Sequence, residues 1–188
     1  RVRPLIELLS GQLEKAEGED RLALQTRVAS LWMDIDAPGS ALMLLEETLD
    51  DSPDAPDAVD LLERLLTLES AREALSESDD DAVELSVRDR AADHLRSHYE
   101  RHGETADVAR VMEVRLETVV GVAERVQLLD QIVELRLKQL DDPAGAFENV
   151  SALVQLEPAE ARRPPFSLAH RASGSTRWPS PTHCWARS

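Results

Sequence analysis

Three histidines have the spacing of a metal site. His94, His98 and His102 follow one another at intervals of four residues, so on a helix they share one face and two imidazoles can bind the same ion. No acidic residue has the position that it takes in the helical motif of zinc proteases. Such a row is also typical of a solvated polar face near a helix end. We therefore predict no metal and no cofactor, with these three histidines as the candidate ligands if a metal binds.

Acidic side chains are the second group that could hold a cation. One series runs from Asp50 to Asp60, and another is the run Asp79-Asp80-Asp81. Carboxylates in such loops usually cap helices and remain solvated, which is the interpretation we favour. The chain has no glycine-rich phosphate loop and no Gly-x-Ser-x-Gly elbow. Since neither nucleotide binding nor a hydrolase triad has a motif, the sequence predicts that the protein is not an enzyme.

Charge divides the chain into two parts. Residues 1–160 contain all 37 acids and 16 Lys or Arg, a net charge of −21, whereas residues 161–188 contain no acid and five Arg. The acidic part would repel a phosphate backbone, and no segment approaches the roughly 20 apolar residues that cross a bilayer. We expect neither nucleic acid nor a membrane as a partner. The lone Cys184 favours a reducing compartment, with the cytoplasm as the default.

The elements that position these residues are helices. Through residues 1–160 the apolar residues recur at intervals of three and four, as at Leu24, Val28, Leu31 and Ile35. No stretch alternates as a strand does. Glycine, proline and aspartate breakers divide the region into eight or nine helices. The sequence therefore predicts an all-α fold.

The ends of several helices carry capping residues. Asp36 and Asp142 are predicted to accept the free N–H groups of the helices that follow them, with Pro38 and Pro143 in the first turns. Gly103 is predicted to end a helix in the left-handed conformation.

An internal repeat organises the helices. The segment Asp36–Leu42 recurs as Asp141–Phe147, an offset of 105 residues. Each copy is followed by an apolar stripe that ends in a proline, Pro53 in the first copy and Pro158 in the second. An offset of this size is about three times a repeat of thirty-odd residues, which indicates helix pairs stacked into an array.

The match continues upstream of these segments. After one-residue gaps, Leu8–Glu14 aligns with Val111–Glu117, so the repeated unit contains at least three helices. We expect three units, a first of about 5–53, a diverged middle one of about 55–102, and a third of about 104–158.

These units resemble a tetratricopeptide repeat (TPR), most closely over 125–158. In that family a small residue of the first helix meets a small residue that opens the second, and a proline closes the unit. Small side chains let two antiparallel helices approach closely, and proline stops the second helix. The resemblance gives these packing positions to Ala29, Trp32, Ala41, Leu45 and Pro53 in the first copy, and to Val133, Ala146, Val150 and Pro158 in the second.

The run Leu-Asp-Asp-Pro-Ala-Gly-Ala-Phe at 140–147 also resembles the long, divergent repeat proteins of GC-rich bacteria such as myxobacteria. Two residues depart from the TPR pattern, since Val133 is larger than the usual Ala or Gly and Arg136 replaces an aromatic residue. The resemblance implies an α-solenoid of antiparallel helix pairs, wound as a right-handed superhelix, which binds or organises other proteins through a concave groove.

Residues 161–188 have no helical pattern. They are rich in Ser, Pro, Thr and Arg and contain Trp178 and Trp185. We keep two interpretations, a disordered basic tail or a segment read out of frame from a GC-rich gene and therefore not native. Because the chain begins at Arg1 rather than Met, we expect a fragment, and an exported parent protein remains open.

Two functions fit these observations. The first is a protein-interaction or scaffold module of a longer helical repeat protein, whose acidity favours a basic or amphipathic protein or peptide. The second is a purely structural repeat segment without a binding site of its own. A metal-binding helix at His94, His98 and His102 is a further alternative.

Overall fold

The computed structural model describes residues 2–74 and 86–156, and within them the chain is built from helices. The Asp79-Asp80-Asp81 run and the basic tail fall outside these ranges. None of the helices described is long and apolar enough to cross a membrane. The helices are α1 (Val2–Leu13), α2 (Gly18–Asp34), α3 (Pro38–Asp51), α4 (Pro56–Thr67), α5 (Glu69–Glu73), α6 (Val87–His102), α7 (Thr105–Leu116), α8 (Val122–Lys138) and α9 (Pro143–Leu156).

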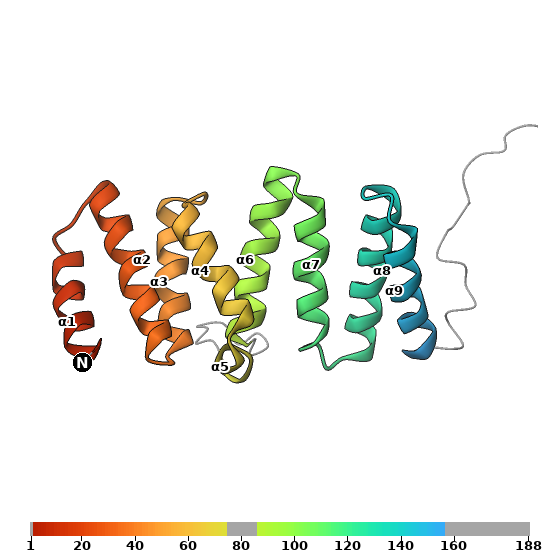
Figure 1. Ribbon diagram of the computed structural model, residues 1–188, viewed down its shortest axis with the longest axis horizontal. Coiled ribbons are helices and arrows are strands. Elements are labelled where there is room, and N and C mark those ends of the chain that lie inside the picture. Colours follow the sequence, from red (N-terminus) through yellow and green to blue (C-terminus); the bar gives the residue numbers. More distant parts are fainter. Residues whose placement is uncertain (1, 75–85, 157–188) are drawn as a thin grey trace, which may run out of the picture.

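The helices stand side by side in one row, in chain order (Figure 1). Successive long helices run in opposite directions, and α2 with α3, α6 with α7 and α8 with α9 form close hairpins. Because α5 is short, α4 packs directly on α6. Among the described residues, helices at opposite ends of the row share no interface. This arrangement confirms the predicted all-α solenoid of antiparallel helix pairs.

The apolar stripes of the helices form two clusters along the row. The larger cluster takes side chains from every helix between α2 and α8, with Leu45, Leu65 and Leu95 fully buried. The smaller one joins α1 to α2 around Ile6 and Val28. Trp32 is partly buried and packs against both clusters. The three- and four-residue periodicity of the sequence therefore corresponds to a core that is extended along the row.

The turn between α2 and α3 corrects one predicted cap. Asp36 has a left-handed backbone, with φ of 61°, and does not cap α3. Its N–H donates to the Met33 carbonyl (3.1 Å), and the next N–H, of Ala37, donates to the Trp32 carbonyl (2.9 Å). This is a Schellman arrangement, so Asp36 ends α2 rather than beginning α3. Its repeat counterpart Asp141 is also left-handed, with φ of 49°.

The other predicted helix ends are confirmed. Asp142 caps α9, because its Oδ1 accepts the N–H of Gly145 at 3.0 Å. This backbone hydrogen bond lowers the pKa of Asp142. Gly103 ends α6 with φ of 72°, and Pro38 and Pro143 are the first residues of their helices. The two copies of the repeat therefore share a left-handed aspartate and a proline start, and differ in the cap.

Candidate functional site

The packing positions predicted from the repeat differ in burial. Ala29 and Ala41 are fully buried in the α2–α3 hairpin, and Val133 and Ala146 are buried in the α8–α9 hairpin. Small residues thus lie where paired helices meet, and Val133 is accommodated although it is larger. The others vary: Leu45 is fully buried, Trp32 and Val150 are partly buried, Pro53 is exposed in the turn before α4, and Pro158 falls outside the described residues.

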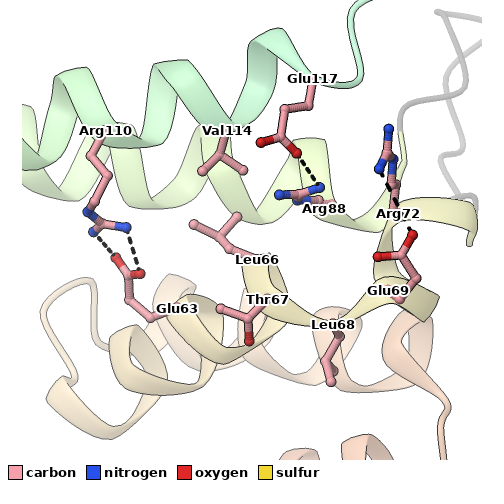
Figure 2. A pocket seen from close by; sticks show the side chains of 10 residues that line it. All are labelled: Glu63, Leu66, Thr67, Leu68, Glu69, Arg72, Arg88, Arg110, Val114 and Glu117. Carbon is pink, nitrogen blue, oxygen red and sulfur yellow. Dashed lines mark hydrogen bonds and ion pairs between the residues drawn. The ribbon is translucent and has the colours of Figure 1, made fainter. Parts of the chain in front are cut away.

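A pocket of about 250 Å³ lies between α4 and α7, two helices that are not consecutive in the chain. Figure 2 shows Arg110 and Val114 on α7 facing Glu63 and Leu66 on α4, with Glu117, just after α7, pointing to Arg88. We call this site the α4–α7 pocket. Its remaining lining residues, from the end of α4, from α5 and from α6, are Thr67, Leu68, Glu69, Arg72 and Arg88.

Glu63 holds one end of this pocket together. Its Oε1 accepts hydrogen bonds from the Tyr99 hydroxyl of α6 (2.6 Å) and from Arg110 Nη2 of α7 (2.5 Å), and its Oε2 accepts Arg110 Nη1 (3.0 Å). Burial pushes the pKa of Glu63 upward, but the bonds from Arg110 and Tyr99 outweigh it and lower that pKa. The ionised carboxylate therefore joins α4 to both α6 and α7.

The other end of the pocket carries two more ion pairs. Arg88 Nη1 lies 3.1 Å from Glu117 Oε2, and Arg72 Nη1 lies 3.9 Å from Glu69 Oε1 (Figure 2). The pocket lining thus has three arginines and three glutamates around an apolar floor, and each arginine lies beside a glutamate. Although the chain is strongly acidic, this site is balanced in charge.

The three histidines of α6 contact two different parts of the molecule. His94 Nε2 lies 3.0 Å from Glu46 Oε1 of α3. His98 and His102 instead face Asp54, in the turn between α3 and α4: His98 Nδ1 is 3.5 Å and His102 Nε2 is 3.8 Å from Asp54 Oδ1. The fold therefore groups Asp54 with His98 and His102, and places His94 apart from them, beside Glu46. Asp54 belongs to the acidic series from Asp50 to Asp60, and only the fold selects it from that series.

Arg136, which departs from the TPR pattern, has a packing role of its own. Its Nη2 donates to Glu113 Oε1 of α7 at 2.5 Å, and its Nη1 forms an ion pair with Asp142, the cap of α9. One side chain of α8 thus contacts the helix before it and the helix after it. An aromatic residue at this position would make neither ion pair.

Comparison with known proteins gives a structural likeness. No protein-family model matches the chain, and no curated protein matches it. A crystal structure from Podosopora anserina, of the nearly identical TPR-like repeats of a protein assigned as a kinesin light chain, is similar at 18% sequence identity. The match covers 86% of this chain and 80% of that chain, with a TM-score of 0.29.

Proposed function

We propose that this chain is a non-catalytic, TPR-like protein-binding module that serves as part of a scaffold in a reducing compartment such as the cytoplasm. The α4–α7 pocket is the observation that carries the proposal. It lies between helices that the predicted repeat assigns to different units, and it combines apolar with charged side chains. At about 250 Å³ it is smaller than the roughly 300–1,000 Å³ typical of sites for small organic ligands. One or two side chains of a protein partner would fill it.

The chemistry of the pocket favours an amphipathic partner segment. An apolar side chain of the partner would contact Leu66 and Val114, while its basic groups would approach Glu69 and Glu117 on the rim. The net charge of −16 would also attract a basic segment from a distance, an effect that salt screens. This partner is consistent with the basic or amphipathic one predicted from composition.

Peptide binding tests this proposal. A library of amphipathic peptides, half with Lys and half with Glu on the polar face, would be titrated against the full chain by fluorescence anisotropy. We expect Lys-bearing peptides to bind and to weaken as salt is raised. Thr67→Arg, at the mouth of the pocket, should weaken binding, whereas Met43→Arg, an exposed position on α3, should not. Binding that ignores both salt and Thr67→Arg would contradict the proposal.

A second candidate, a purely structural segment of a longer array, is favoured by residues that the repeat makes equivalent. Leu42 of α3 is 2% exposed, whereas its counterpart Phe147 of α9 is 72% exposed. Val111 of α7 is 1% exposed, whereas its counterpart Leu8 of α1 is 60% exposed. In each pair, neighbouring helices cover the residue that lies inside the row, which is Leu42 in one pair and Val111 in the other. The same faces on α1 and α9 therefore fit a further helix of the same kind.

Self-association distinguishes this second candidate. If the faces of α1 and α9 are stacking surfaces, the chain should associate end to end as its concentration rises in analytical ultracentrifugation. Replacing both Leu8 and Phe147 with Gln should abolish the association, whereas Met43→Gln, which removes an equally exposed apolar side chain of α3, should leave it intact. A chain that remains monomeric at every concentration would count against a purely structural role.

A further inference from the structure

The geometry points to a metal site: we infer that Asp54, His98 and His102 bind one divalent transition-metal ion, such as Zn²⁺ or Ni²⁺. One ligand atom from each residue lies within 4.8 Å of the other two. Tetrahedral coordination with bonds of 2.0–2.2 Å separates ligand atoms by about 3.3 Å. The two distances from Asp54 Oδ1, 3.5 Å and 3.8 Å, are already close to this value. Small side-chain rotations would complete the site.

His102 is held in the form that a metal requires. Its Nδ1 lies 2.9 Å from the backbone carbonyl oxygen of His98. A carbonyl oxygen can only accept, so Nδ1 carries a proton, and in the neutral imidazole it is Nε2 that presents the lone pair. That Nε2 is the atom that approaches Asp54. Hydrogen bonding of the second ring nitrogen to a carbonyl is the usual way in which a protein orients a metal-binding histidine.

His98 supplies the second nitrogen ligand, and its buried Nδ1 gives a further reason to expect a bound ion. Its side chain is only 16% exposed, and its Nδ1 is buried without a hydrogen-bond partner among the described residues. Buried polar atoms without partners are uncommon, because losing contact with water costs free energy. A metal ion between His98 and Asp54 would satisfy this nitrogen. The imidazoles of His98 and His102 are one turn apart, with ring centroids separated by 4.3 Å.

Arg101 competes for the same carboxylate. Its Nη1 lies 3.1 Å from Asp54 Oδ1, and its Nη2 donates to the Pro53 carbonyl at 3.1 Å. A metal ion must displace the guanidinium from Asp54, so the arginine sets a limit on metal affinity. Once bound, the ion would connect the turn between α3 and α4 to the last turns of α6.

Isothermal titration calorimetry with ZnCl₂ and with NiCl₂ tests the site in the full chain. Cys184→Ser should be the common background, so that the thiol does not bind the metal. We expect one binding event that His98→Gln and Asp54→Asn each weaken about tenfold or more. His94→Gln removes an imidazole from the same helix outside the site and should leave the affinity unchanged. Arg101→Gln should tighten binding, because it frees Asp54 Oδ1 from the guanidinium.

Thermal unfolding supplies a second readout. Metal should raise the Tm of the background protein and of His94→Gln, because an ion that binds the folded state stabilises it. The same metal concentration should raise the Tm of His98→Gln much less. If that variant does not fold, His102→Gln replaces it. Equal affinities for the background protein and the His98 and His102 variants would overturn the site, as would the absence of heat with both metals.

Discussion

Glu63 shows how one side chain can hold three helices. It accepts hydrogen bonds from α6 and α7 while it is anchored in α4. Glu63→Gln removes the charge and one acceptor, so we expect a loss of about 1–2 kcal/mol in the free energy of unfolding at pH 7, measured with urea. Glu47→Gln is the control, because the ion pair of Glu47 with Arg21 lies at the surface and should contribute little. Equal effects of the two changes would contradict this role.

The pH dependence of this difference follows from the lowered pKa of Glu63. A carboxyl group whose pKa is lower in the folded than in the unfolded chain stabilises the fold above its ordinary value of 4.5. That stabilisation is lost as the pH falls through the lower, folded-state pKa. The gap between the original chain and Glu63→Gln should therefore be full at pH 7 and shrink below about pH 4.5, in urea titrations across this range. A gap that does not change with pH would show that Glu63 acts through packing alone.

Paired helices approach closely at Ala41 and Ala146. Both are buried, so Ala41→Leu and Ala146→Leu should each lower the free energy of unfolding by about 1–3 kcal/mol through overpacking. Ala144→Leu, on the exposed side of α9, should be close to neutral in the same urea titrations. Neutral results at both buried positions would undermine the alignment of the two hairpins.

At the two left-handed aspartates, the Gly variant should be more stable than the Ala variant, the reverse of the order within a helix. At Asp36 and Asp141 the Gly variant should be about 1 kcal/mol more stable than the Ala variant, because a Cβ is disfavoured at positive φ. At Ser40, an exposed position within α3, the order should be reversed, because Ala favours a helix and Gly does not. Thermal unfolding of the six variants compares the three positions. The same order everywhere would contradict the backbone geometry.

Helix positions were largely predictable from the sequence, whereas the contacts between helices were not. Apolar periodicity and breakers are local properties, and they located the helices and the ends at Gly103 and Asp142. Asp36 was misassigned because a short carboxylate suits both an N-cap and a left-handed C-terminal turn. The pairing of Glu63 with Arg110 depends on how helices of different units are rotated, as does the choice of Asp54 rather than a neighbouring aspartate. No spacing along the chain contains that information.

At the scale of the whole molecule, a core substitution should destabilise only the helices near it. Ile6 belongs to the small cluster between α1 and α2, so Ile6→Ala, at a cost of about 2–4 kcal/mol, should raise hydrogen exchange in α1 and leave α8 and α9 protected. Ile132→Ala, in the larger cluster, should act on α7 and α8 instead. Exchange followed by mass spectrometry locates both effects. A uniform loss of protection along the row would mean that the helices unfold as one unit.

Packing between near neighbours alone also gives the molecule the mechanics of a spring. Because no interface joins distant helices of the described row, a load on its two ends meets only the resistance of contacts between helices that are close in chain order (Figure 1). A small rotation at each contact adds to a large change in length with little distortion of any one helix. The Glu63–Arg110 ion pair joins α4 to α7 across α6, and so it resists the separation of these two helices. Bending that separates α4 from α7 must therefore break this ion pair.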